Sequence, residues 1–274
     1  MSNSGSLTTL RFRRLLLTGA AGGLGRELRG RLKAYCDTLR LSDIADLGAA
    51  APGEEVRPAR LEDAAAMRAL LDGVDAVVHL GGYSVEGPWE PILQANIIGL
   101  YNLYEAARAH GVKRVIFASS NHVTGFYRQD EVIDSRMPAR PDGLYGVSKA
   151  FGENLSRMYF DRHGIETVCL RIGSSYPEPK DRRMLATWLS YDDLERLVVA
   201  GLTAPVVGHT LIFGISDNAR RWYDNRFAAH VGYRPRDSSD PFRPAVDARQ
   251  PELDRSDPAV VYQGGVFVRT GPFD

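Results

Sequence analysis

The most constraining feature of the sequence is a glycine-rich segment, residues 19–25 (GAAGGLG), which separates two stretches of different periodicity. Residues 11–18 (RFRRLLLT) end in a continuous apolar run, which predicts a buried strand. Residues 24–35 repeat an apolar residue at helical spacing, which predicts a helix with one buried face. Glycines between a strand and a helix allow backbone N–H groups at the helix N-terminus to approach a pyrophosphate. We therefore predict a dinucleotide-binding site here, and a glycine-rich turn without a ligand is the alternative.

The alternation of strands and helices continues through the first two-thirds of the chain. We expect further strands at residues 38–44, 76–80, 114–119 and 167–172, and helices at residues 63–71, 91–110 and 145–163. Strands joined by helical crossovers form a parallel sheet, and short continuous apolar runs fit a sheet that is covered on both faces. The predicted fold class is therefore α/β, with a Rossmann-type doubly wound parallel sheet and a small C-terminal substrate-binding portion.

The periodicity weakens beyond residue 172. We expect a helix at residues 192–200, a strand at residues 210–215, and from residue 216 a tail rich in Arg, Asp and Pro without a clear period. The predicted organisation is a dinucleotide-binding core over residues 1–176. Residues 177–274 would then supply the substrate-binding segments, the last core strand and the tail, within the same compact unit.

The charge balance and the cysteine content exclude several classes of protein. The chain has 34 Lys and Arg and 34 Asp and Glu residues, so it lacks the basic excess of a nucleic-acid-binding protein. Its two cysteines, Cys36 and Cys169, cannot build a disulfide framework and fit a reducing compartment. No apolar run approaches the ~20 residues of a membrane span, residues 1–9 lack the apolar centre of a secretory signal, and the histidines show no metal-ligand spacing. We therefore expect a cytoplasmic protein without nucleic-acid, membrane or metal partners.

An acidic residue, Asp43, follows the glycines and ends the second predicted strand. A carboxylate at this position accepts hydrogen bonds from both hydroxyls of an adenosine ribose and repels a ribose phosphate. It therefore favours NAD over NADP as the cofactor. Arg26 in the glycine segment argues the other way, because a basic residue there can serve a phosphate. A helix cap or a surface acid is the alternative role of Asp43.

Two side chains with complementary acid–base chemistry, Tyr145 and Lys149, share one face of the helix predicted at residues 145–163. We expect the lysine ammonium to lower the pKa of the phenol from its usual ~10, so that the phenolate accepts a proton from an alcohol as a hydride leaves the same carbon. Ser119 and Ser120 end the strand predicted at residues 114–119, at the edge where parallel sheets bind ligands. A serine hydroxyl there can orient the reacting oxygen. An ordinary surface Tyr–Lys pair is the alternative.

Together these residues resemble the extended type of the short-chain dehydrogenase/reductase superfamily, over about residues 15–177. The resemblance implies that Ser120, Tyr145 and Lys149 are catalytic, and that Lys149 also holds the nicotinamide ribose. Arg60 departs from the family, which usually has an acid near the adenine at this position. Members of the superfamily often pair through their long helices, so a homo-oligomer is expected. The implied NAD site consists of Gly19, Gly22, Gly23, Leu24, Gly25, Asp43, Leu61, Leu80, Gly81, Gly82, Ser84, Asn96, Tyr145, Lys149 and Ile172.

Within this superfamily the chain is most similar to the uronate dehydrogenase family. The similar segments are residues 79–86 (HLGGYSVE), 119–122 (SSNH), 171–174 (RIGS), 182–185 (RRML) and 263–267 (QGGVF). This resemblance implies NAD-dependent oxidation of hexuronates, glucuronate and galacturonate, to aldarolactones by hydride transfer. It also implies a substrate site formed by Ser84, Ser120, Asn121, His122, Tyr145, Ser174 and Arg183.

The chemistry of these residue types agrees with a sugar acid as the substrate. A guanidinium binds a carboxylate through two parallel hydrogen bonds, and the resemblance selects Arg183 rather than its neighbours Arg182 and Lys180. Oxidising an open aldehyde usually requires a thiol that first forms a covalent adduct. Neither Cys36 nor Cys169 is expected near the Ser–Tyr–Lys set. We therefore expect the cyclic hemiacetal to be the substrate, with oxidation at C1.

Two alternative functions belong to the same fold. A sugar-nucleotide epimerase or dehydratase shares the glycine motif and the Tyr–Lys pair, but such enzymes carry a larger C-terminal domain than the roughly 100 residues that follow Ile172 here. A non-enzymatic NAD-sensing regulator is expected to lack part of the catalytic set, whereas Ser120, Tyr145 and Lys149 are all present.

Overall fold

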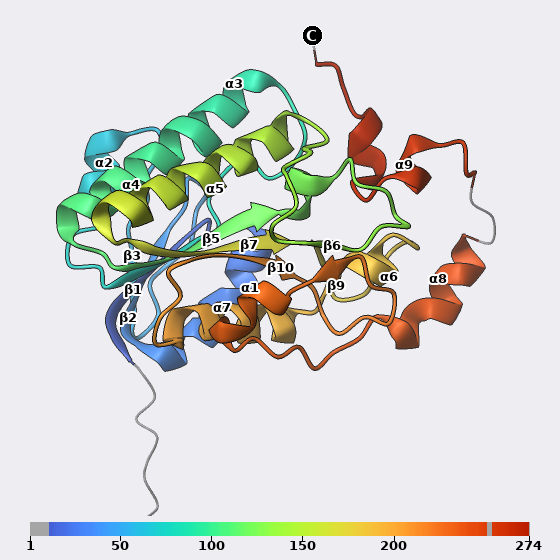
Figure 1. Ribbon diagram of the computed structural model, residues 1–274. Coiled ribbons are helices and arrows are strands. Elements are labelled where there is room, and N and C mark those ends of the chain that lie inside the picture. Colours follow the sequence, from blue (N-terminus) through green and yellow to red (C-terminus); the bar gives the residue numbers. More distant parts are fainter. Residues whose placement is uncertain (1–10, 251–253, 274) are drawn as a thin grey trace, which may run out of the picture.

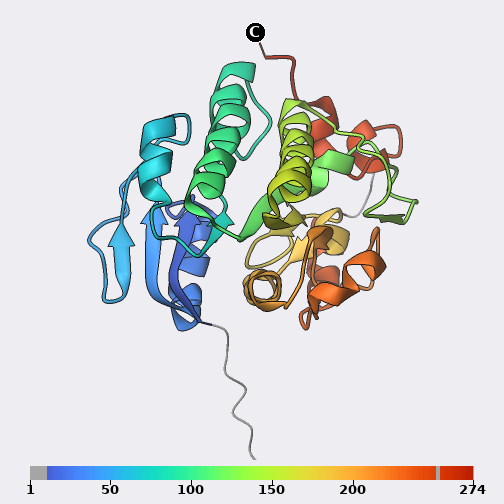
Figure 2. The ribbon, with the colours of Figure 1, turned by 60° about the vertical axis from the view of Figure 1, so that its left-hand side comes forward.

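A seven-stranded parallel sheet forms the centre of the molecule (Figures 1 and 2). The computed structural model describes residues 11–250 and 254–273. The strand order is β10-β7-β5-β4-β1-β2-β3, and every neighbouring pair is parallel. This order, in which the chain returns from β3 across β1 to β4, confirms the predicted doubly wound fold. The bounds are β1 (Phe12–Thr18), β2 (Cys36–Ser42), β3 (Glu54–Val56), β4 (Ala76–His79), β5 (Arg114–Ser120), β7 (Glu166–Ile172) and β10 (His209–Gly214).

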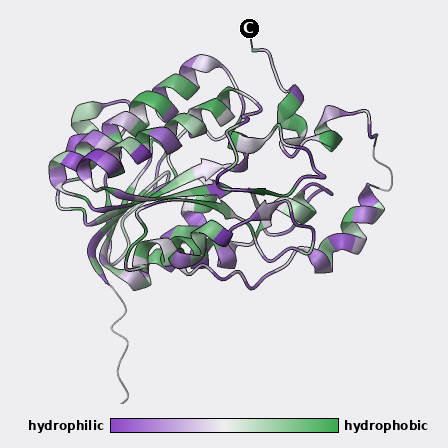
Figure 3. Cartoon of the chain, in the orientation of Figure 1, coloured by the Kyte–Doolittle hydropathy of each residue, from purple (hydrophilic) through white to green (hydrophobic). Residues whose placement is uncertain are grey.

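Helices cover both faces of the sheet, which explains why its strands are almost continuously apolar. Leu15 and Leu17 of β1 belong to one core cluster, with α1 and α7, whereas Leu16 belongs to the cluster on the other face. Figure 3 shows that the helices carry both apolar and hydrophilic residues, as expected for helices with one buried face. One face is covered by α2 (Ala64–Leu70), α4 (Gly99–His110) and α5 (Leu144–His163), and the other by α1 (Gly23–Leu32) and α7 (Tyr191–Thr203) (Figure 1).

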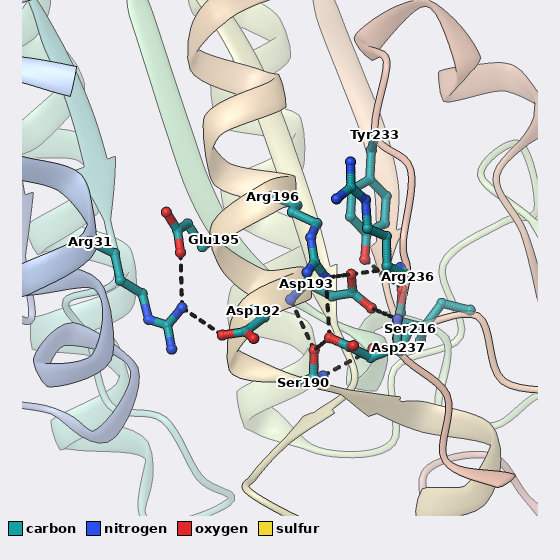
Figure 4. Close-up of polar contacts among 11 residues, drawn as sticks. Arg31, Ser190, Asp192, Asp193, Glu195, Arg196, Ser216, Tyr233, Arg236 and Asp237 are labelled. Atoms are coloured by element: carbon teal, nitrogen blue, oxygen red, sulfur yellow. Dashed lines mark hydrogen bonds and ion pairs between the residues drawn. The ribbon is translucent and has the colours of Figure 1, made fainter. Parts of the chain in front are cut away.

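Ion pairs connect α1 to α7, and a buried carboxylate connects α7 to the chain that follows β10 (Figure 4). Arg31 of α1 contacts Asp192 at 2.7 Å and Glu195 at 2.9 Å, both in α7. The carboxylate of Asp193, which is fully buried, accepts hydrogen bonds from the backbone N–H groups of residues 236 and 237. Acidic residues in the first turn also suit the positive end of the helix dipole. The connection that follows β10 is therefore held against α7.

The helix predicted at residues 91–110 begins earlier and is not uniform. It consists of α3 (Trp89–Ile92), a π-helical segment (Leu93–Ile98) and α4. A π-helical turn adds one residue to the helical ladder and is frequent at functional sites. Asn96, the residue expected to contact the cofactor, is buried within this segment.

Several short elements were not predicted, because two or three residues carry no recognisable period. Besides β3, these are β6 (Ile133–Asp134), which pairs with β11 (Tyr223–Asp224), and β8 (Ser174–Ser175), which pairs with β9 (Trp188–Leu189). The first helix ends at Leu32 rather than Tyr35, and a 3-10 turn follows it. Among the described residues, no helix is both long enough and apolar enough to cross a membrane.

The C-terminal part of the chain returns to the start of α5 (Figure 1, red). Residue 262 forms a bridge with residue 128, and the Gln263 side-chain amide donates hydrogen bonds to the carbonyls of residues 128 and 131. The last residues therefore lie beside the loop that follows β5. The short helical elements in the last third of the chain are α6 (Met184–Thr187), α8 (Arg243–Arg249), α9 (Pro258–Val261) and a 3-10 segment (Gly265–Arg269).

Candidate active site

A cavity of about 1430 Å³ lies along the carboxyl ends of the parallel strands, where doubly wound folds bind ligands. It extends from the glycine segment to residues 264–269 near the C-terminus. Two expected site residues, Asn96 and Asn121, do not line it. The expected residues that do line it are Gly19, Gly22, Gly23, Leu24, Gly25, Asp43, Leu61, Leu80, Gly81, Gly82, Ser84, Ser120, His122, Tyr145, Lys149, Ile172, Ser174 and Arg183.

The glycine segment joins β1 to α1 with little room for side chains. Gly19 has φ +69°, and a Cβ there would lie 2.7 Å from the backbone N of Gly81. A Cβ on Gly25 would lie 2.1 Å from the carbonyl oxygen of Gly19. Gly22 and Gly23 are exposed where the segment lines the cavity, and Gly23 starts α1. The helix N-terminus is thus open to an anionic ligand at this end of the cavity.

Asp43 follows β2 beside the glycine segment. One carboxylate oxygen accepts a hydrogen bond from the backbone N–H of Ala21 at 2.9 Å, and the other accepts one from the N–H of Ala45 at 3.0 Å. The carboxylate lines the cavity while these bonds hold it in place. Arg60 also lines the cavity, and its charge is paired with Glu62 at 2.6 Å.

Ser120, Tyr145 and Lys149 come together at the ends of β5 and the start of α5. All three side chains are buried and line the cavity. The Lys149 ammonium donates a hydrogen bond to the carbonyl of Ala118 at 2.8 Å and lies 5.6 Å from the centroid of the Tyr145 ring. This is the cluster that the Ser…Tyr-x-x-x-Lys spacing predicts.

The pKa of Tyr145 differs from the expectation. Burial raises the pKa of its phenol to about 12, the nearby Asp142 carboxylate acts in the same direction, and the Ser120 hydroxyl opposes both. Burial also lowers the pKa of Lys149 to about 8. The expected lowering of the phenol pKa is therefore wrong for this cavity, because loss of water around the charged form is the largest effect on the phenol.

A buried glutamate, Glu86, fixes the start of α5. Its carboxylate accepts hydrogen bonds from the backbone N–H groups of Leu144, at 3.0 Å, and Tyr145, at 2.9 Å. A Cβ on Gly143 would lie 2.1 Å from this carboxylate. A negative group at a helix N-terminus is stabilising, and here it sets the position of the tyrosine backbone. No role for Glu86 was predicted, since the contact spans 59 residues.

Asn96 lies behind the cavity wall. Its side-chain oxygen accepts a hydrogen bond from the Tyr83 N–H, and its amide nitrogen donates to the Tyr83 carbonyl and to the Ser148 hydroxyl. These bonds connect the π-helical segment, the loop after β4 and α5. Asn96 therefore holds the wall in place, and its predicted contact with the cofactor stays a prediction.

The residues after Ser120 form a buried polar cluster. The amide of Asn121 donates a hydrogen bond to the hydroxyl of Tyr223 at 3.3 Å. His122 lines the cavity, and its Nδ1 lies 2.6 Å from a carboxylate oxygen of Asp142. The ring of Phe267 stacks on the imidazole with 3.9 Å between centroids. Neither Asp142 nor Phe267 was expected in a contact of this kind.

Arg183 also lines the cavity, and its charge is close enough to His122 to act on the pKa of the imidazole. Its Nε donates a hydrogen bond to the carbonyl of Gln263 at 2.6 Å, and its Nη1 donates one to the hydroxyl of Ser174 at 3.3 Å. The remaining nitrogen, Nη2, is buried and has no hydrogen-bond partner within the described residues. Gly265 leaves room for the side chain, since a Cβ there would lie 2.5 Å from Cδ of Arg183. A guanidinium that lines a cavity and has not used all its donors is suited to an anionic ligand.

The fold and the site define a class of protein, an enzyme that transfers hydride between a dinucleotide and an alcohol carbon. A family model described as the NAD dependent epimerase/dehydratase family matches residues 15–202, and the chain belongs to this family. More particularly, the chain is similar to uronate dehydrogenase of Pseudomonas putida, with 59% identity over 269 residues that span 98% of this chain and 100% of that protein.

Solved structures give the same relationship. The crystal structure of uronate dehydrogenase from Agrobacterium tumefaciens is 52% identical and covers 96% of this chain and 98% of its own, with a TM-score of 0.93. A tyrosine-to-alanine mutant of that enzyme complexed with NAD is likewise 52% identical, with a TM-score of 0.93 and coverage of 95% and 98%.

Proposed function

We propose that this protein is an NAD-dependent uronate dehydrogenase, which oxidises the cyclic hemiacetal of a hexuronate at C1 to the aldarolactone. The substrates are glucuronate and galacturonate. One observation carries the proposal beyond the family: the Arg183 side chain, whose Nη2 has no hydrogen-bond partner within the described residues, lines the same cavity as Tyr145 and Lys149. A sugar acid has its carboxylate at one end and its anomeric carbon at the other, so one molecule can use both groups.

The residues present fit NAD. The open N-terminus of α1, with Gly22 and Gly23 facing the cavity, suits a pyrophosphate. The Asp43 carboxylate lies at that end of the cavity and would accept hydrogen bonds from the ribose hydroxyls. Lys149 would hold the nicotinamide ribose. When bound, NAD supplies the acceptor for the hydride.

The chain's own groups handle the proton. Tyr145 accepts the proton of the anomeric hydroxyl through its phenolic oxygen, and Ser120 donates a hydrogen bond to the reacting oxygen. Lys149, with a pKa of about 8, is largely an ammonium at neutral pH and stabilises the tyrosinate. Because burial raises the pKa of Tyr145, we expect catalysis to become faster as the pH rises towards about 8, above which Lys149 loses its charge.

The cysteines support a hemiacetal substrate. Cys36 and Cys169 are both buried, and neither lines the cavity in the described part of the chain. Burial raises the pKa of both thiols, so neither is poised as a nucleophile. An open aldehyde would therefore lack the thiol that its oxidation usually needs. The cyclic form already carries an OH and an H on C1.

Residues after the core would complete the substrate site. We assign Arg183 to the carboxylate, and Ser84, Ser120, His122 and Ser174 to the sugar hydroxyls, with residues 177–274 as the substrate-binding portion. Asn121 does not line the cavity, so its predicted contact with the substrate stays a prediction. A cytoplasmic location and self-association stay predictions.

Absorbance of NADH tests the proposal directly. The protein is mixed with NAD and, in separate assays, with glucuronate, galacturonate, glucose or a UDP-sugar. We expect rapid NADH formation with the two uronates and a much slower rate with glucose. Turnover of the UDP-sugar in place of the uronates would refute the proposal and favour an epimerase or dehydratase.

A further inference from the structure

The imidazole of His122 is held on several sides. Its Nδ1 lies 2.6 Å from Oδ2 of Asp142. The ring of Phe267 stacks on one face, with 14° between the ring planes, and the ring of Tyr145 meets it edge-on at 5.9 Å. The orientation of the imidazole is therefore set by the protein itself, next to the proposed proton acceptor.

Asp142 occupies a space that two separate loops leave for it. Its side chain has no exposed surface. A Cβ on Gly125 or on Gly264 would lie only 1.9 Å from Oδ2. The other oxygen, Oδ1, is buried and has no hydrogen-bond partner within the described residues. A buried carboxylate with an unused oxygen opposes folding, so this residue requires a reason beyond packing.

The contact between the two side chains determines where the imidazole carries its proton. A carboxylate only accepts hydrogen bonds, so Nδ1 of His122 must be the donor. Burial lowers the pKa of His122 despite the opposing effect of Asp142, so the ring is neutral at neutral pH. Its Nε2 then presents a lone pair. This atom makes no hydrogen bond to the described residues and is not fully buried, so it faces the cavity.

We propose that Asp142 is a positioning residue, which holds His122 in the Nδ1–H tautomer so that Nε2 accepts a hydrogen bond from a substrate hydroxyl. The inference rests on the proposed function, since it assigns a polar contact to the same substrate. A fixed acceptor at this place requires a hydroxyl with a free proton. It therefore selects against sugars in which that hydroxyl is missing or is alkylated.

The charged groups around this pair supply a second, independent readout. His122 faces Asp142, Glu86 and Arg183, and the phenol of Tyr145 faces Asp142, Ser120 and Lys149. The Asp142 carboxylate acts to raise the pKa of the phenol. Neutralising Asp142 therefore favours the tyrosinate, and the acid limb of the kcat profile should move to lower pH.

A double-mutant cycle with uronate as the substrate tests the proposal. Asp142→Asn keeps the shape of the side chain, but its amide can donate to Nδ1 and favour the wrong tautomer. We expect the KM for uronate to rise about 10- to 100-fold, the loss of one well-placed hydrogen bond, with a smaller change in kcat. His122→Gln should raise KM by a similar factor. The double variant should be no worse than the weaker-binding single variant, because Asp142 acts through His122.

A matched control removes the charge of a carboxylate that does not contact His122. Asp130→Asn changes an exposed residue that pairs with Arg128, and it should leave KM and the pH profile unchanged. A KM for Asp142→Asn within twofold of the wild type would overturn the inference. So would independent, multiplicative effects of the Asp142 and His122 substitutions, or an acid limb that does not move.

Nitrogen-15 NMR of histidine-labelled wild-type protein tests the tautomer even if Asp142→Asn does not fold. The signal of His122 is assigned by its absence in His122→Gln. We expect a protonated Nδ1 and an unprotonated Nε2, and the reverse pattern would overturn the inference. If the wild type does not oxidise uronates, the proposed function fails, whereas normal uronate oxidation with the wrong tautomer refutes only the role of Asp142.

Discussion

Arg183 provides the sharpest test of the substrate, because two of its three side-chain nitrogens have hydrogen-bond partners and the third has none within the described residues. Nε is used by the Gln263 carbonyl and Nη1 by the Ser174 hydroxyl, whereas Nη2 has no partner within the described residues. If the guanidinium binds the uronate carboxylate, Arg183→Ala removes one charge-assisted hydrogen bond, about 1.5–3 kcal/mol. The kcat/KM for glucuronate should then fall by about 10- to 150-fold.

Glucose is the matched substrate, since it differs from glucuronate only in having CH₂OH in place of the carboxylate at C6. Its slow oxidation should change little in Arg183→Ala, because glucose never used the ion pair. The enzyme variant and the substrate variant thus form a double-mutant cycle. Arg183→Lys should recover only part of the loss, since an ammonium keeps the charge but cannot reproduce the planar donor geometry of a guanidinium.

The neighbouring arginine serves as the control for this experiment. Arg182 donates to the carbonyl of Gln250 and pairs with Asp247 at 3.1 Å, so Arg182→Ala should have a small effect on the ratio of the two sugars. Rates of NADH formation for both sugars in all variants give the comparison. If Arg183→Ala slows glucuronate and glucose by the same factor, Arg183 only supports the Gln263 backbone, and the assignment of the carboxylate to it is refuted.

Three further predictions follow from single residues. Asp43→Ala should weaken NAD binding by about 10- to 100-fold, since the variant loses both the ribose contact and the hydrogen bond to Ala21. The wild type should prefer NAD over NADP, and equal kcat/KM values for the two cofactors would contradict the role of Asp43. Tyr145→Phe should lower kcat by about 10²- to 10⁴-fold while NAD still binds, and a variant that keeps a tenth of the wild-type kcat would remove Tyr145 from the mechanism. Wild-type activity should rise with pH up to about 8, because the pKa of Tyr145 is raised and Lys149 loses its charge above that pH. Burial lowers the pKa of His79 from 6.5 to about 3, so the unfolded chain binds more protons than the folded protein between these pH values. The protein should therefore lose stability as the pH falls below about 6.5. The free energy of unfolding in urea should depend less on pH in His79→Gln, and an unchanged dependence would exclude His79 as a cause.

The sheet and the reactive cluster were predictable from the sequence because both rest on local patterns. The apolar runs gave the strands, and the glycines between β1 and α1 gave the turn that opens the cavity. The spacing of Tyr145 and Lys149 on one helix predicts that the two side chains lie close together, and this prediction needs no information on distant contacts. The ends of parallel strands meet at one edge of the sheet, which is why Ser120 joins them.

The supporting groups were not predictable, because each depends on a contact between distant parts of the chain. Glu86 reaches the start of α5 from a loop 59 residues away, and Phe267 reaches His122 from the C-terminus. Both residues lie in segments that carry the resemblance, residues 79–86 and 263–267, but nothing in the sequence indicates which partner each one contacts. The direction of the Tyr145 pKa shift was missed for a related reason, since burial depends on the whole enclosure and not on the lysine alone.

Three buried carboxylates lie on or beside α5, and they differ in how their charges are compensated. Glu153 is bound by the Arg171 guanidinium and the Ser119 hydroxyl, and Glu86 is bound by two backbone N–H groups at the positive end of α5. Their charges are therefore largely compensated before substrate enters. Asp142 is the exception, because one of its oxygens has no partner within the described residues and its charge raises the pKa of the Tyr145 phenol. The Asp142 carboxylate opposes ionisation of the proposed base, so its presence is not explained by that step. The proposed orientation of His122 gives it a separate role. We expect the cationic Lys149 to supply the compensation as the proton moves, because it lies one helical turn from Tyr145 with its ammonium 5.6 Å from the centroid of the phenol ring.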